Sequence, residues 1–153
     1  MKVISKVYFT ENVAIISFEK APAQIGFLSN LFDQVAKAGI NVDMISQTAP
    51  KGMCNTISFT VSDENVTDIL AIITGLNVEQ YAVMPLVSAG NVKISLYGEE
   101  MPSKVGVAAD VFDRLNEKGI DILLITTSDV DISVVVSSAN ADLAFRTLEK
   151  AYL

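Results

Sequence analysis

An internal repeat constrains the fold of this chain more than any other feature. The passage GINVDMISQT at residues 39–48 returns eighty residues later as GIDILLITTS at residues 119–128. Further residues recur at the same spacing: Pro22, Gly26, Phe32, Asp33, Gly39, Ile40 and Ile45 return as Pro102, Gly106, Phe112, Asp113, Gly119, Ile120 and Ile125. Self-similarity of this kind indicates two copies of one supersecondary unit.

The two copies differ at two places. After the repeated passage the spacing falls to 75, because the seven residues 49–55 stand where the second copy has only residues 129–130. The first copy also opens its apolar passage with Asn41-Val42-Asp43, whereas the second opens with Asp121-Ile122-Leu123. Asp43 therefore matches Leu123, so the two copies differ in charge at this position.

Hydrophobic periodicity predicts the same order of elements in both copies: strand, helix, strand, strand, helix. Apolar residues recur at helical spacing in residues 27–35 and 107–115, and a second helix follows Ser62 and Ser137, which are candidate N-caps. The predicted strands are rich in β-branched and aromatic residues. They cover residues 13–18, 41–48 and 56–61 in the first copy and residues 92–97, 121–128 and 131–136 in the second.

A closing strand is predicted for the first copy only, around residues 77–84. The second copy ends in a helix, while the strand-like segment at residues 3–9 has no partner in the first copy. An unpaired sheet edge is a liability that proteins cover. We therefore expect the N-terminal strand to complete the second unit. The expected domains are residues 11–86, and residues 1–10 together with 87–153.

Composition excludes several classes of protein. The net charge is −7, which disfavours binding to nucleic acid or to an anionic membrane surface. No apolar run is long enough for a signal peptide or a spanning helix. One cysteine, Cys54, and no histidine leave no metal-ligand pattern and no common general base. We expect a cytoplasmic protein without a metal, a cofactor or catalytic residues.

The phrases GINVDMISQ, TISFTV, VKISLYG and GIDILLITTSDVDISVVV resemble the regulatory region of aspartokinases over essentially the whole chain. That region is a tandem pair of ACT domains. The resemblance implies an α+β fold of two ferredoxin-like βαββαβ units, with antiparallel sheets and helices on one face. It also implies an amino-acid-binding allosteric sensor of lysine biosynthesis, a homodimer through its ACT units, and an aspartokinase catalytic chain as a possible partner.

The resemblance further implies a site for lysine or threonine at an interface between ACT domains. Carried over to this sequence, the binding residues are Ala21, Gln24, Ile25, Gly26, Phe27, Leu28, Asn41, Val42, Asp43 and Gln47. Asp121 and Ile122 are expected to contribute to a neighbouring wall. The family's usual Pro-Gly before the helix is here Ile25-Gly26, with the proline displaced to Pro22.

A zwitterionic ligand explains this choice of residues. The helix that follows Gly26 offers unpaired N–H groups and positive dipole to a carboxylate, and Asp43 can accept from an ammonium group. Gly26 either lets the ligand approach the backbone or allows close packing of helix on sheet. Asp43 and Gln47 are otherwise solvated residues of a strand.

Other classes of function remain to be weighed against a sensor. The ferredoxin-like fold also hosts enzymes, but both arginines, Arg114 and Arg146, lie on predicted helices rather than in a glycine-rich loop. An RNA-binding sheet needs positive charge, which a pI near 4.4 does not provide. A ligand-free oligomerisation module is the serious alternative. The kinase domain that usually precedes this region is absent from the sequence, which is therefore a free-standing sensor, a separate subunit or an excised regulatory half.

Overall fold

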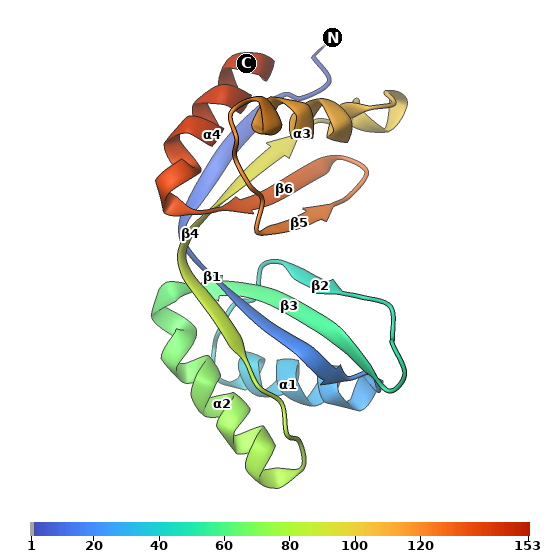
Figure 1. Cartoon of the computed structure of the whole chain (residues 1–153), viewed down its shortest axis with the longest axis vertical. Coiled ribbons are helices and arrows are strands. Elements are labelled where there is room, and N and C mark those ends of the chain that lie inside the picture. Colours follow the sequence, from blue (N-terminus) through green and yellow to red (C-terminus); the bar gives the residue numbers. More distant parts are fainter. Residues whose placement is uncertain (1) are drawn as a thin grey trace. The chain divides into compact units, whose positions relative to one another are not determined.

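The computed structural model describes residues 2–153 and has the α+β architecture that the repeat predicts (Figure 1). The chain forms two compact units. The first unit is Ala14–Ala89, and the second unit combines the N-terminal residues up to Val13 with Gly90–Leu153. Strands β1 (Lys6–Pro22) and β4 (Leu86–Tyr97) each contribute residues to both units.

The first unit is a βαββαβ unit with the strand order β2-β3-β1-β4. Its strands β2 and β3 run antiparallel, with Ile45 opposite Phe59 and Gln47 opposite Ile57. The elements between β1 and β4 are α1 (Ile25–Lys37), β2 (Ile45–Gln47), β3 (Cys54–Ser62), the short 3-10 helix η1 (Asp63–Asn65) and α2 (Val66–Glu79).

The second unit repeats this arrangement with the strand order β5-β6-β4-β1. Strand β6 pairs antiparallel with β4 on one side, with Val92 opposite Val136, and with β5 on the other. The elements after β4 are the 3-10 helix η2 (Met101–Ser103), α3 (Val107–Glu117), β5 (Leu124–Thr127), β6 (Asp131–Val136) and α4 (Ser138–Tyr152).

The N-terminal strand completes the second unit, as the sequence predicts. The backbone N–H of Ser5 donates to the carbonyl oxygen of Tyr97 over 2.8 Å, at the end of β4. Ile4 is 1% exposed and packs with Val7 into the core of this unit. Burial of these side chains removes apolar surface from water, which holds the segment in place.

Two helices pack on one face of each sheet, and the repeat recurs in the two cores. The buried side chains of the first unit include Leu31, Val35, Phe59, Ile69 and Ile73. Their counterparts in the second unit are Val111, Leu115, Val134, Ala144 and Leu148, which are also buried. Matching residues in the sequence thus occupy matching places in the two units.

The structure corrects the expected closing strand of the first copy. Residues 77–84 are not a strand, because α2 runs on to Glu79. Leu76 is 2% exposed and continues the buried helical face, while Val78 is 83% exposed. The Asn77 side chain then holds the chain beyond the helix, since its amide both donates to and accepts from the backbone of Val83. The fourth strand of this unit comes from the start of β4 instead.

Strands β2 and β5 are shorter than the predicted strands 41–48 and 121–128. Pairing does extend before β2, because the Asp43 N–H donates to the carbonyl oxygen of Thr60. The hydroxyl of Thr60, which is buried, also accepts from the N–H of Met44, so this stretch departs from a regular ladder. Within residues 2–153, no helix is long and apolar enough to cross a bilayer.

Candidate functional site

The loop before α1 presents one group of the predicted binding residues. Gln24 is the N-cap residue in an extended conformation, and no side chain caps the first turn of the helix. The free backbone N–H groups in the first turn of α1 and the positive end of the helix dipole can therefore bind an anion. Gln24, Ile25 and Gly26 are exposed, and Ile25 is 77% exposed, which is unusual for an isoleucine.

Three other predicted residues of this group turn inward. Ala21 and Phe27 are buried in the core of the first unit, and Leu28 packs partly against it. The Phe27 ring meets Phe18 edge-on, with ring centroids 5.8 Å apart. The side chains of Ala21 and Phe27 therefore fix the loop, and only their backbone atoms can face a ligand.

Gly26 has open space on the side where a side chain would project. A Cβ atom added at Gly26 would meet nothing within 4 Å. Close packing of helix on sheet therefore does not explain this glycine in the present chain. Its matching residue, Gly106, differs, because its φ of +92° lies in the left-handed region that favours glycine.

Asn41, Val42 and Asp43 form the second group, ahead of β2. Asn41 and Asp43 are exposed, whereas Val42 packs against the core, as alternation along an extended chain requires. The second unit has the same alternation: Asp121 and Leu123 are exposed, and Ile122 packs against its core.

The backbone places Asp43 and Leu123 at equivalent positions. The Asp43 N–H donates to the carbonyl oxygen of Thr60 over 3.1 Å, and the Leu123 N–H donates to that of Val135 over 2.8 Å. Leu123 is 47% exposed. The two units thus present a carboxylate and an apolar side chain from the same point of the fold.

Within the first unit these two groups lie at opposite ends of α1. That helix has 13 residues, so at about 1.5 Å per residue it separates Gly26 from Asn41 by roughly 20 Å. One small amino acid cannot span that distance. In Figure 1, β2 begins near the end of α1 and runs back in the direction of the start of α1. Gln47 is the last residue of β2.

The second unit shows how the helix start and the end of the edge strand meet. A hollow of about 300 Å³ is lined both by the loop before α3, including Gly106 and Val107, and by Thr127 at the end of β5. At the repeat spacing these positions match Gly26, Phe27 and Gln47 of the first unit.

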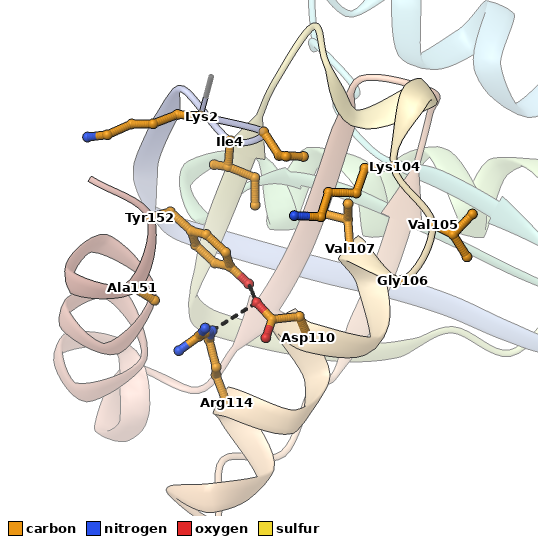
Figure 2. Close-up of a pocket in the computed structure, with 11 residues that line it drawn as sticks. Lys2, Ile4, Lys104, Val105, Gly106, Val107, Asp110, Arg114, Ala151 and Tyr152 are labelled. Carbon is orange, nitrogen blue, oxygen red and sulfur yellow. Dashed lines mark hydrogen bonds and ion pairs between the residues drawn. The ribbon is translucent and has the colours of Figure 1, made fainter.

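A larger hollow, of about 490 Å³, adjoins the other side of the α3 start in the second unit (Figure 2). Asp110 is one of its lining residues and accepts hydrogen bonds from the Tyr152 hydroxyl and from Nε of Arg114. Lys2 and Lys104 also line it. Sequence reasoning missed this cluster, although the i,i+4 spacing of Asp110 and Arg114 is a signal for such a pair.

The contacts around Asp110 perturb two titratable groups. The Tyr152 hydroxyl and the Arg114 guanidinium hold the pKa of Asp110 below its usual value. Burial, together with the Asp110 carboxylate, raises the pKa of Tyr152 to about 12. The cluster is therefore an ionised carboxylate held between a neutral phenol and a permanent cation, an arrangement that orders α4 against α3.

The described residues show no grouping of side chains that would support metal binding. No group of three or more Cys, Asp or Glu residues within 2–153 could hold a metal ion. Cys54 is a free, half-buried thiol. The exposed backbone and carboxylate groups described above suit reversible binding of a small molecule.

The chain is similar to known proteins in both sequence and fold. Residues 94–152 match the model of an ACT domain. The chain is 28% identical over 150 residues to an aspartate kinase of Stutzerimonas stutzeri, and the match covers 98% of this chain and 36% of that protein. It therefore spans about a third of the length of the curated relatives it matches.

Solved structures match from end to end. The regulatory subunit of aspartate kinase from Thermus thermophilus, solved in a ligand-free form, superposes with a TM-score of 0.89 at 28% identity, covering 99% of this chain and all of that one. A structure of aspartokinase alpha and beta subunits matches at 33% identity with a TM-score of 0.86, covering 97% of this chain and 98% of that one. By fold, length and sequence, this chain belongs to the ACT-domain family, in the branch that forms the regulatory region of aspartokinases.

Proposed function

We propose that this chain senses a free amino acid and, through it, controls the activity of an aspartate kinase catalytic chain. The proposal rests on the end-to-end match with two solved regulatory subunits of aspartate kinase. The match covers the whole length of each of those chains. The chain has no catalytic role by itself in this proposal. Lysine or threonine is the favoured ligand, as the family resemblance implies.

The site of this proposal needs two ACT units. The start of α1 supplies N–H groups for the ligand carboxylate, and Asp43 accepts from its ammonium group. Because these groups lie about 20 Å apart in one unit, they must come from different units. We infer that the first units of two copies of the chain supply them, so that a homodimer is the binding species.

Exposed apolar side chains support such an assembly. Ile25 at the helix start and Ile45 on the edge strand β2 are 77% and 52% exposed. Edge strands and exposed apolar groups are usually covered in soluble proteins. Contact with a second copy would bury both close to the ligand, beside Gln24, Gly26 and Gln47.

Calorimetric titration with a panel of amino acids tests this function. Saturable binding of lysine or threonine, at one ligand per chain, supports the sensor. Absence of binding by every amino acid, with an intact dimer, would instead identify a ligand-free oligomerisation module. Addition of the ligand to the chain mixed with an aspartate kinase catalytic chain then tests whether binding changes the phosphorylation rate.

A further inference from the structure

The first unit contains a buried polar side chain without a partner. Asn55, near the start of β3, is 4% exposed, and neither Nδ2 nor Oδ1 has a hydrogen-bond partner among residues 2–153. Other buried polar groups are satisfied: Thr60 accepts from the Met44 N–H, and Ser95 bonds Ser133. Native proteins rarely leave a buried amide unpaired, because it loses its bonds to water without replacing them.

Asn55 lines a hollow of about 590 Å³ at the end of the sheet. The other lining residues come from the ends of β1, β2 and β3 and from the loop between β2 and β3; they are Glu19, Lys20, Thr48, Ala49, Lys51, Cys54 and Thr56. None of them belongs to the predicted lysine or threonine site.

The strands bring Lys20 beside Asn55. Ser17 bonds Ser58 through their hydroxyls, and the Thr56 hydroxyl donates to the carbonyl oxygen of Glu19. These two bonds align β1 with β3 so that residue 20 comes next to residue 55. Side chains two residues apart on a strand point to the same face of the sheet. Lys20 and Asn55 therefore lie on the same face as the buried Phe18 and Ile57.

The loop that closes the hollow is held in shape by backbone bonds. The Lys51 N–H donates to the carbonyl oxygen of Cys54 over 2.7 Å, and Gly52 takes a φ of +67° in the turn between them. The Thr56 N–H donates to the Thr48 hydroxyl. Lys51 is therefore carried on an ordered turn, which lowers the entropic cost of using it in binding.

This hollow belongs to the insertion that distinguishes the two copies. Residues 49–55 stand where the second copy has residues 129–130. From here on the two copies match at a spacing of 75 residues, so Ile57 corresponds to Ile132 and Asn55 corresponds to Val130. The second unit thus places an apolar residue at the matching position. An amide there is a feature of the first unit alone.

We propose that Asn55, Lys20 and Lys51 form a second binding site, for an amino acid with a carboxylate in its side chain. The Asn55 amide offers a donor and an acceptor side by side, which match a carboxylate oxygen and an ammonium hydrogen. Neither lysine forms a salt bridge among residues 2–153. Their positive charges can therefore neutralise the two carboxylates of such a ligand. Glu19 can accept from its ammonium group.

The site does not use Asp43 or the start of α1, so it is independent of the proposed lysine or threonine site. Two sites of different charge preference on one unit would let the chain report on two metabolites. Bound ligand at Asn55 would also stiffen the loop that contacts the start of α1, since the Ala23 N–H donates to the carbonyl oxygen of Met53.

Titration of the full chain with L-glutamate and L-aspartate, followed by ¹H–¹⁵N correlation spectra, tests the proposal. The Asn55 side-chain NH₂ signals, assigned by their loss in Asn55→Leu, should shift saturably at up to millimolar ligand. Lysine should not shift them. Lys20→Met and Lys51→Met should each weaken binding by about tenfold. Lys118→Met, which removes an exposed lysine of the second unit, should leave it unchanged.

The proposal is overturned if neither acidic amino acid shifts these signals, which is the result expected when only water satisfies Asn55. It is also overturned if the shifts persist unchanged in Lys20→Met and Lys51→Met, whose exposed side chains can be replaced without disturbing the core. That pair of variants keeps the test decisive even where Asn55→Leu folds poorly.

Discussion

Gly98 lies so close to Val3 that a Cβ atom added at Gly98 would come within 1.7 Å of the Val3 carbonyl oxygen. Real side chains never make such a contact, so the N-terminal segment can pass only where position 98 is glycine. Gly98 directly follows β4, and its N–H donates to the carbonyl oxygen of Val130. This glycine therefore sets the path of the strand that completes the second unit.

Gly98→Ala should displace the segment around Val3 and lower the free energy of unfolding of the second unit by about 1–3 kcal/mol or more, as overpacking does. Chemical denaturation measures this loss. Gly75→Ala in α2 is the matched control, since an added Cβ there meets nothing within 4 Å. That change should stabilise the helix by about 0.5–1 kcal/mol. Equal behaviour of the two variants would contradict the role of Gly98.

Ile4→Ala should destabilise the second unit selectively. Ile4 is 1% exposed in the core of that unit, and truncation of a buried isoleucine costs about 2–5 kcal/mol. Hydrogen exchange should show protection falling in residues 90–153 while residues 14–89 keep theirs. Val78→Ala, at a position 83% exposed, is the control. Loss of protection mainly in residues 14–89 would refute the expectation.

Asp43→Asn should weaken binding of the lysine or threonine ligand. Loss of one partner of a desolvated charge pair costs about 2–5 kcal/mol, or roughly 30-fold or more in affinity. Leu123→Ala changes the matching residue of the second unit and should leave the affinity as it was. Calorimetry on both variants checks this, and parent-like affinity of Asp43→Asn would remove Asp43 from the site.

Mixing two defective variants should restore binding if the site is shared between copies. Gly26→Phe blocks the helix start, where an added side chain has room, and Asp43→Asn removes the acceptor. In a mixed dimer one of the two sites keeps both functional groups. Random exchange of equal amounts makes half of the dimers mixed, so about a quarter of all sites should bind. Light scattering should show a dimer at micromolar concentration. No recovery on mixing would indicate that each copy binds by itself or not at all.

The Asp110 cluster should appear in an alkaline titration. Burial raises the pKa of Tyr152 to about 12 from an ordinary value of 10.0, so its stabilising effect is complete below pH 10 and is lost as the pH rises to about 12. Absorbance of phenolate should show one of the four tyrosines ionising near pH 12, and Tyr152→Phe should abolish that step. If the step near pH 12 persisted in Tyr152→Phe, the assignment to Tyr152 would be wrong.

Sequence periodicity predicts most of this fold because many of the residues that match between the two copies are buried core residues. Leu31 and Val111, or Ile73 and Leu148, match in sequence since both copies must fill the same core. Residues 77–84 were harder to predict, because valines at 78 and 83 suit a strand while Leu76 extends the buried face of a helix. Only the packing of Leu76 decides between them.

The candidate site is less visible in the sequence than the fold. Asn41 and Asp43 stand out by the contrast between the copies, and their exposure follows from alternation. Periodicity cannot reveal that the start of α1 lies about 20 Å from them within one unit, since that separation depends on the direction of the helix. Asn55 is likewise inconspicuous, because a polar residue at a strand end is ordinarily solvated.

The division of β1 between the two units has a consequence for synthesis on the ribosome. Residues 14–89 can fold as soon as they emerge, since every strand of the first unit is then present. Residues up to 13 emerge earlier but must wait for β4, β5 and β6, some eighty residues later. Contacts so distant along the chain form slowly. The N-terminal segment, with its apolar Ile4 and Val7, therefore stays exposed in the nascent chain until those strands emerge, and a chaperone that covers it would favour correct folding.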